Sequence, residues 1–503
     1  MSHAHLTVDP HFTVGTIQRR LFGGFVEHLG RHVYDGIYEP GHPSADAEGW
    51  RTDVIELVKE LGVDCIRYPG GNFVSGFKWE DSVGPREERP RRLDLAWHST
   101  ETNEVGLHEF SSWLDKVGSD LMLAVNLGTR GTAEALDLIE YANVPGGTAL
   151  SEQRRANGRD QPFGVKMWCL GNEMDGPWQL GHRNADDYGK IAAQTARALR
   201  QVDPDIELVA CGSSSAQMPT FGAWERTVLE HAYDEVDFIS CHAYYEEYDG
   251  DLDSFLASAV NMDRFIETVV DTADHVKALK KSDKTINISF DEWNVWYITR
   301  FENVDKITGM DNWPVAPRLL EDVYSVADAV VFGNLMISLL KHADRVTSAS
   351  LAQLVNVIAP IMTEPGGPAW RQTTFFPFSI TSRLARGAAL ELKLDAPTYE
   401  TTRHGVVPLV DAVATHDAES GASAAFLVNR SATEPLMVTV DVAQLGDVSV
   451  LESHTLADDD IYAKNTLDEP ERVAPRANDT AVIAGGTLTI TLPPVSWTAL
   501  ALG

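Results

Sequence analysis

The chain of 503 residues is too long for a single ordinary core and long enough for a large barrel plus a second domain. Hydrophobic residues make up 44% and charged residues 23%, a balance typical of folded globular proteins. The formal net charge of −33 repels nucleic acid and anionic membranes, so we expect neither as a partner.

The cysteines predict buried, reduced thiols. They are Cys65, Cys169, Cys211 and Cys241, all within apolar runs. No C-x-x-C pair or Cys/His cluster occurs, so we expect neither a disulfide framework nor a metal site. No apolar run is long enough to cross a bilayer, and the N-terminal residues lack the apolar centre of a signal peptide. We therefore expect a cytoplasmic protein, although a secreted precursor that had lost its leader would give the same pattern.

Apolar strand-like runs alternate with helical patterns from about residue 20 to residue 385. The predicted strands cover residues 22–27, 65–69, 121–127, 166–173, 207–211, 238–244, 286–293 and 347–353. The longer predicted helices cover residues 52–61, 184–202, 252–281 and 319–342. Eight strands, each followed by a helix, indicate a (β/α)8 TIM barrel rather than an open sheet.

The two ends of the chain have a different pattern. After about residue 388, short strands such as 424–429, 437–442 and 487–492 alternate with Gly, Asp, Pro and Ser clusters, which is typical of a β-sandwich. Residues 4–17 alternate like a strand, but the barrel already has its eight strands from residue 21 onward. We expect residues 1–19 to join a jelly-roll-like β-sandwich formed by residues 386–503, with the barrel at residues 20–385.

Polar side chains recur where the predicted barrel strands end. They are Glu27, Arg67, Asn126, Asn172, Glu173, His242, Tyr244, Glu292 and Gln353. Barrel active sites lie at the C-terminal ends of the strands. The agreement across several strands therefore predicts a functional site at that end of the barrel.

Glu173 and Glu292 are the strongest catalytic candidates. Each follows an apolar strand, where partial desolvation can tune the pKa of a carboxyl group. Two such carboxyl groups can act as acid and nucleophile across a glycosidic bond, which needs no metal or organic cofactor. Two ordinary glutamates in salt bridges are the alternative, and the tryptophan-rich surroundings of both favour catalysis.

Seven segments share the order and character of motifs in one known enzyme family. They are residues 22–28 (FGGFVEH), 67–73 (RYPGGNF), 171–179 (GNEMDGPWQ), 241–245 (CHAYY), 291–297 (DEWNVWY), 352–356 (AQLVN) and 429–431 (NRS). In them the chain resembles, nearly end to end, the family 51 glycoside hydrolases, the α-L-arabinofuranosidases. The resemblance implies a retaining, exo-acting enzyme with Glu173 as acid/base and Glu292 as nucleophile, and it suggests a homo-hexamer.

The resemblance also implies a set of substrate-binding residues. Asn172 is expected to bind the ring beside the cleaved bond, and Glu27, Asn72, Tyr244 and Gln353 are expected to complete the pocket. Arg67 is a plausible partner that keeps Glu292 charged, unless it forms a salt bridge with Glu27 instead. His242 could hydrogen-bond the acid/base or Tyr244, or be a structural histidine. Trp97, Trp178 and Trp296 are candidate stacking platforms, although each could equally lie in the core.

Strand alternation also gives a negative expectation. Asp291 precedes Glu292 on the same predicted strand, so it should point away from the nucleophile's side and lie outside the site.

The expected substrates are arabinofuranose-containing oligosaccharides derived from arabinan or arabinoxylan. The alternatives are an endo-glucanase or xylanase on the same barrel, or a sugar-binding protein that has lost activity, against which the presence of both glutamates argues.

Overall fold

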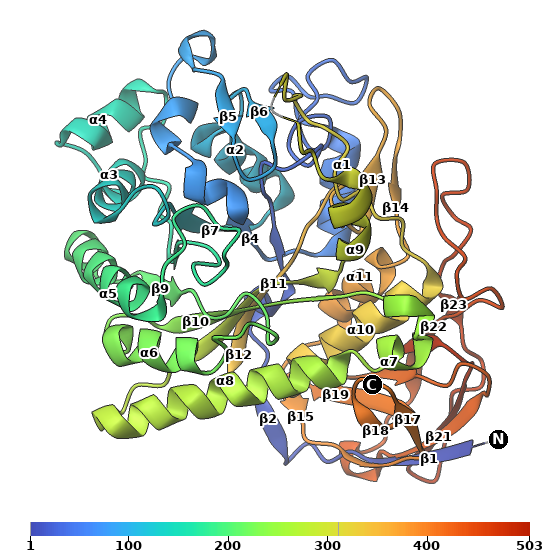
Figure 1. Cartoon of the computed structure of the whole chain (residues 1–503). Coiled ribbons are helices and arrows are strands. Elements are labelled where there is room, and N and C mark those ends of the chain that lie inside the picture. The colour runs from blue at the N-terminus through green and yellow to red at the C-terminus, as the bar shows by residue number, and fades with distance from the viewer. Residues whose placement is uncertain (1, 310) are drawn as a thin grey trace.

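The computed structural model describes residues 2–309 and 311–503 and contains a closed barrel beside a β-sandwich (Figure 1). The barrel strands are β3 (Gly23–Phe25), β4 (Cys65–Tyr68), β7 (Asp120–Val125), β8 (Met167–Leu170), β9 (Glu207–Ala210), β10 (Phe238–Tyr245), β11 (Asn287–Val295) and β12 (Val346–Leu351). All neighbours are parallel, and β12 pairs with β3 to close the ring. Each strand falls within or overlaps a predicted run, so the barrel prediction is confirmed.

The helices surround the barrel. They are α1 (Thr52–Leu61), α2 (Leu107–Val117), α3 (Thr132–Asn143), α4 (Ala149–Ala156), α5 (Ala185–Val202), α6 (Ala223–Ala232), α7 (Leu252–Leu256), α8 (Ala259–Lys280), α9 (Ile298–Arg300), α10 (Val326–Lys341) and α11 (Phe375–Leu384). Within the described residues, no helix has the length and apolar character needed to cross a bilayer.

Two predicted helices differ from those observed. The stretch 252–281 is two helices, because the backbone leaves helical geometry at Ala257 (φ −96°, ψ 10°). The stretch 319–342 becomes helical only at Val326. Ser325 is the N-cap there, and its side chain accepts a hydrogen bond from the Asp328 backbone, which fixes the start of α10.

The β-sandwich has two sheets. One has the order β16 (Lys393–Asp395), β1 (Ser2–Thr7), β21 (Leu436–Asp441), β25 (Thr487–Leu492) and β24 (Val482–Ala484). The other has the order β2 (Thr13–Thr16), β15 (Ala388–Leu390), β19 (Val410–His416), β20 (Ser423–Asn429), β26 (Ser496–Leu502), β22 (Val450–Leu456) and β23 (Arg476–Ala477). Smaller hairpins are β5 (Arg92–Asp94) with β6 (Ser99–Glu101), β13 (Ile361–Thr363) with β14 (Ala369–Arg371), and β17 (Thr398–Thr401) with β18 (Gly405–Pro408).

Both N-terminal strands pair with C-terminal strands. In Figure 1, β1 (blue) lies among the orange and red strands. It pairs parallel with β21 and antiparallel with β16, whereas β2 pairs with β15 of the other sheet. The predicted single strand 4–17 is thus two strands, because a turn at Asp9, whose side chain accepts a hydrogen bond from the backbone of His11, separates them.

Helix α10 forms the boundary between barrel and sandwich. Nearly all its residues are buried, because it packs on β11 and β12 on one side and on β19, β20 and β26 on the other. Gly333 allows the close approach, since a Cβ there would lie 2.3 Å from Cδ1 of Trp497 on β26. Lys341 of α10 and Arg430 after β20 both pair with Asp411 of β19, at 3.3 and 2.9 Å.

The four cysteines are buried free thiols, as predicted. Cys65 and Cys169 belong to a small apolar cluster contributed by neighbouring barrel strands, together with Met122, Met167 and Phe238. Burial raises the pKa of Cys65 to about 12. Cys65 and Cys169 therefore act as small apolar side chains within this cluster.

Candidate active site

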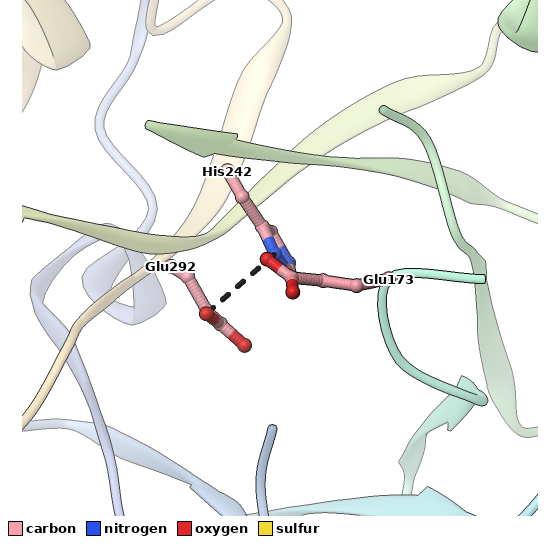
Figure 2. Close-up of side chains that lie close together, drawn as sticks. All are labelled: Glu173, His242 and Glu292. Carbon is pink, nitrogen blue, oxygen red and sulfur yellow. Dashed lines mark hydrogen bonds and ion pairs between the residues drawn. The ribbon is translucent and has the colours of Figure 1, made fainter. Parts of the chain in front are cut away.

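Three titratable side chains meet at the C-terminal end of the barrel (Figure 2). Glu173 follows β8, His242 lies on β10 and Glu292 lies on β11. Nδ1 of His242 is 2.9 Å from Oε1 of Glu173 and 3.6 Å from Oε2 of Glu292. One oxygen of each glutamate and one ring nitrogen all lie within 4.8 Å of one another. The three side chains are buried, so their interactions are little screened by water.

A strained turn after β8 positions Glu173. Its backbone has φ 42°, in the left-handed region that residues with a Cβ rarely adopt. Two donors hold the carboxylate, since Oε2 accepts a hydrogen bond from Nε1 of Trp178 at 2.8 Å and Oε1 faces His242. Asp175 anchors the turn by accepting hydrogen bonds from the backbone and hydroxyl of Ser214. Strain maintained by surrounding contacts is typical of a functional position.

Two donors also fix Glu292. Arg67 of β4 donates from Nη1 to Oε1 at 2.8 Å, and the hydroxyl of Tyr244 donates to Oε2 at 2.8 Å. Burial and the neighbouring Glu173 raise the pKa of Glu292, whereas the charges of His242 and Arg67 oppose that increase. Arg67 thus forms an ion pair with Glu292 and a longer one, at 3.8 Å, with Asp291. It does not pair with Glu27, which was the alternative.

Asp291 belongs to this site, so its exclusion by strand alternation was wrong. Its Oδ1 lies 2.7 Å from Nε2 of His242. Ser240 pairs with Ser289 but His242 pairs with Glu292, so two residues of β11 stand opposite one residue of β10. Such a β-bulge breaks the alternation of side chains and turns consecutive residues to the same side.

His242 is held as a cation between carboxylates. Burial alone would lower its pKa, but the charge of Glu292 and the hydrogen bonds to Asp291 and Glu173 outweigh burial and raise the pKa to about 10. Both ring nitrogens face carboxylate oxygens, so both carry protons and donate. His242 therefore supplies a constant positive charge near neutral pH and does not act as a proton donor or acceptor.

Glu27 forms a second polar group beside this cluster. Its Oε1 accepts hydrogen bonds from the backbone of Phe73 at 2.9 Å and from Nε1 of Trp97 at 2.8 Å, and its Oε2 accepts one from Nε2 of Gln353 at 3.1 Å. Burial, together with the charge of Glu292, raises the pKa of Glu27 to about 8, despite those donors. A carboxyl group that is mostly protonated near neutral pH can donate to a sugar hydroxyl as well as accept from one.

Two asparagines continue the network from Arg67. Nη2 of Arg67 donates to Oδ1 of Asn172 at 2.6 Å, and Nδ2 of Asn172 donates to Oδ1 of Asn72 at 3.3 Å. The sequence predicted a set of catalytic and binding residues. Apart from Trp296, each of them is thus hydrogen-bonded to another predicted residue or to Trp97 or Trp178. Trp296 contacts Tyr244 instead, with ring centroids 5.0 Å apart.

These side chains open into a pocket of about 330 Å³, which we call the catalytic pocket. Trp97, Trp178 and Trp296 all line it, together with Glu173 and Tyr244. Its lining also includes Ile298, Phe301, Lys306 and Ile307 from the segment after β11, residues that belong to none of the sequence motifs. A pocket of this size walled by tryptophans suits one terminal sugar ring.

Comparison with known proteins identifies the family. A model described as the α-L-arabinofuranosidase C-terminal domain matches residues 291–496, and one described as the α-L-arabinofuranosidase 1 domain matches residues 57–252. A Bifidobacterium longum protein named exo-α-(1→6)-L-arabinofuranosidase is 62% identical over 99% of this chain and 97% of its own length. A Streptomyces lividans protein named intracellular exo-α-(1→5)-L-arabinofuranosidase is also 62% identical, over 99% of this chain and 75% of its own. The chain belongs to the family 51 α-L-arabinofuranosidases.

Solved structures agree with this assignment. A family 51 α-L-arabinofuranosidase from Bifidobacterium longum is 50% identical and superposes with a TM-score of 0.96 over 100% of both chains. The structure of an α-L-arabinofuranosidase from Thermotoga maritima is 31% identical, with a TM-score of 0.88 over 99% of both chains. The resemblance found in the sequence is confirmed, and this protein is a glycoside hydrolase with exo-acting α-L-arabinofuranosidase activity.

The site of this arabinofuranosidase disfavours a metal ion. Glu173, His242 and Glu292 are close enough to share one. Both nitrogens of His242 already donate to carboxylates, however, and Glu292 is paired with the guanidinium of Arg67. A divalent cation would have to displace a proton from the imidazolium and lie beside a fixed positive charge.

Proposed function

We propose that this arabinofuranosidase is a retaining enzyme in which Glu173 is the acid/base and Glu292 the nucleophile. The observation that carries the proposal is the short approach of the two carboxyl groups, whose nearest oxygens lie within 4.8 Å. Retaining glycosidases place their carboxyl groups about 5–5.5 Å apart, whereas inverting ones need roughly 6.5–9.5 Å to admit a water molecule.

In the first step, an oxygen of Glu292 attacks the anomeric carbon and the bond to the leaving oxygen breaks. The proton of Glu173 passes to that oxygen, so the leaving group departs as a neutral alcohol. Arg67 and Tyr244 hold the nucleophile by its two oxygens and orient it before attack. The product of this step is a covalent arabinosyl ester of Glu292.

In the second step, Glu173 acts as a base. It takes a proton from a water molecule whose oxygen attacks the anomeric carbon, and the ester bond to Glu292 breaks. Two inversions leave arabinose with its original configuration. The imidazolium of His242 faces both carboxylates and compensates their negative charge while the proton moves between water, Glu173 and the leaving group.

We propose that Glu27, Asn72, Asn172, Tyr244, Trp296 and Gln353 bind the terminal arabinofuranose. Their amide and carboxyl groups converge from separate barrel strands and loops, as recognition of several ring hydroxyls requires. The neutral form of Glu27 can donate to one hydroxyl while Gln353 is held in place by Glu27 and by His32.

We propose oligosaccharides derived from arabinan or arabinoxylan as the natural substrates. Two relatives of equal identity are named for different linkages, (1→6) and (1→5), so the family relation does not fix the linkage. We further propose a cytoplasmic location, because several relatives are named intracellular. We also propose a homo-hexamer and domain boundaries at residues 19 and 385, and the pairing of β1 and β2 with strands of the sandwich supports the first boundary.

A panel of 4-nitrophenyl glycosides, followed by proton NMR of the first product anomer, tests the proposal. We expect hydrolysis of the α-L-arabinofuranoside with release of the α-anomer of arabinose before mutarotation. The β-anomer as first product would exclude retention. Preference for β-glucoside or β-xyloside substrates would favour the endo-acting alternative, and binding without turnover of any substrate would favour a sugar-binding protein.

A further inference from the structure

A second hollow, of about 580 Å³, lies beside the catalytic pocket. We call it the hairpin hollow, because the turn of the β17–β18 hairpin, which the chain forms between β16 and β19 of the sandwich, contributes Arg403 and His404 to its wall. The rest of its wall comes from the barrel, with Arg264 and Asn261 of α8 and the segment after β10. The hollow is therefore built jointly by the two domains.

The hairpin is fixed to the barrel at several points. The hydroxyl of Tyr399 donates to the carbonyl of Asp253 at 3.0 Å, and the backbone of Arg403 donates to the hydroxyl of Ser254 at 3.2 Å. The guanidinium of Arg403 lies over the ring of Tyr248, 4.4 Å from its centroid. The wall of the hollow is thus preorganised rather than a free loop.

The hollow continues directly from the catalytic pocket. Ser215, Gln217, Tyr244 and Tyr248 line both of them. Tyr244 marks the catalytic side, because its hydroxyl contacts the nucleophile. A chain of sugars whose terminal ring occupies the catalytic pocket can therefore extend past Tyr248 into the hollow.

The charges of the hollow balance. Arg264 and Arg403 contribute two positive charges, and neither has an ion-pair partner in the part of the chain that the structure describes. Glu246 and Asp251 contribute two negative charges, and both already accept hydrogen bonds from neighbouring groups. Burial and the charge of Arg264 lower the pKa of His404, which leaves its ring uncharged near neutral pH. Arg264 donates to the carbonyl of His404 at 3.3 Å, and its remaining N–H groups and those of Arg403 are not engaged by a carboxylate of the described residues. Such donors in a hollow without net charge suit a neutral, hydroxyl-rich ligand.

We propose that the hairpin hollow binds the leaving-group sugars of a neutral oligosaccharide, so that the β-sandwich takes part in substrate selection. This inference rests on the proposed function of the catalytic pocket. Arg403 is the central residue, since it lies on the shared Tyr248 and comes from the sandwich. It should affect only those substrates that are long enough to reach the hollow.

The test compares kcat/KM for 4-nitrophenyl α-L-arabinofuranoside with that for a linear series from arabinobiose to arabinotetraose. For Arg403→Ala we expect a loss of about tenfold on the longest oligosaccharide, the value of one or two hydrogen bonds, and less than about twofold on the chromogenic substrate. Arg264→Ala should act in the same direction. Arg476→Ala, at an exposed position on β23 of the same domain, is the matched control and should change neither.

Several results would overturn the inference. An equal loss on all substrates would place Arg403 in folding or in catalysis, and no loss on the oligosaccharides would leave the hollow without a role in binding. A preference for uronate-bearing oligosaccharides that disappears in Arg403→Ala would contradict the neutral ligand. Inactivity of the unmodified enzyme on the chromogenic substrate would instead refute the proposed function, which keeps the two failures distinct.

Discussion

Replacing Glu292 with alanine should create an anion site in the position of the nucleophile. The side chain's removal leaves Nη1 of Arg67 and the hydroxyl of Tyr244 without the carboxylate oxygens that they contact at 2.8 Å each. The guanidinium of Arg67 has then lost its nearest carboxylate, and with the hydroxyl of Tyr244 it offers two donors to an added anion. Without an added nucleophile, we expect turnover to fall about 10⁴-fold or more.

Azide should restore turnover in this variant. A hydrogen bond to a charged group contributes about 1.5–3 kcal/mol, so two of them give about 3–6 kcal/mol for a bound azide. Since about 4 kcal/mol corresponds to a dissociation constant of 1 mM, rescue should saturate in the millimolar range. Tyr244→Phe in the Glu292→Ala background removes one donor and should raise the half-saturating azide concentration by roughly tenfold to a hundredfold.

The assay is an azide titration with 4-nitrophenyl α-L-arabinofuranoside, followed by proton NMR of the arabinosyl azide. Azide in Glu292→Ala attacks from the nucleophile's face, so the product should be inverted. Glu173→Ala is the matched variant. It keeps the nucleophile and should accumulate the covalent intermediate, which azide can open without a general base to give retained product. If the two variants gave the opposite stereochemistry, the roles assigned to Glu173 and Glu292 would have to be exchanged.

Three further predictions concern stability, each measured by urea denaturation. The carboxylates of Glu292, Asp291 and Glu173 raise the pKa of His242 from an ordinary 6.5 to about 10, and Asp291→Asn removes one of the three. The contact of Asp291 with Arg67 is lost at every pH, but the part of the loss that depends on His242, about 1.5–3 kcal/mol, should be fully present below pH 6.5 and disappear as pH rises through 10. A loss that stays constant across this range would contradict the assignment. Gly333→Ala should destabilise by about 1–3 kcal/mol because the new methyl group meets Trp497, whereas a gain from helix propensity would refute that contact. Deleting residues 1–17 removes strands from both sheets of the sandwich and should lower the urea midpoint, and an unchanged midpoint would place those residues outside the fold.

Local pattern was enough to predict the barrel and its two glutamates. Strands buried on both faces are mostly apolar, so each barrel strand is visible as a short apolar run with polar residues at or near its C-terminal end. Parallel strands bring their C-terminal ends to one edge, which is why Glu173 and Glu292 could be expected to meet although 119 positions separate them in the numbering. The family motifs sharpened this expectation because they surround the same strand ends.

The tertiary structure alone decided what depends on pairing between distant segments. The β-bulge that turns Asp291 into the site exists only in the register of β11 against β10, and strict alternation predicted the opposite. The hairpin hollow joins Arg403 to Tyr248 across two domains, and no periodicity links residues so far apart. Sequence periodicity reports which face of an element is buried, whereas register and domain packing depend on the sum of many long-range contacts.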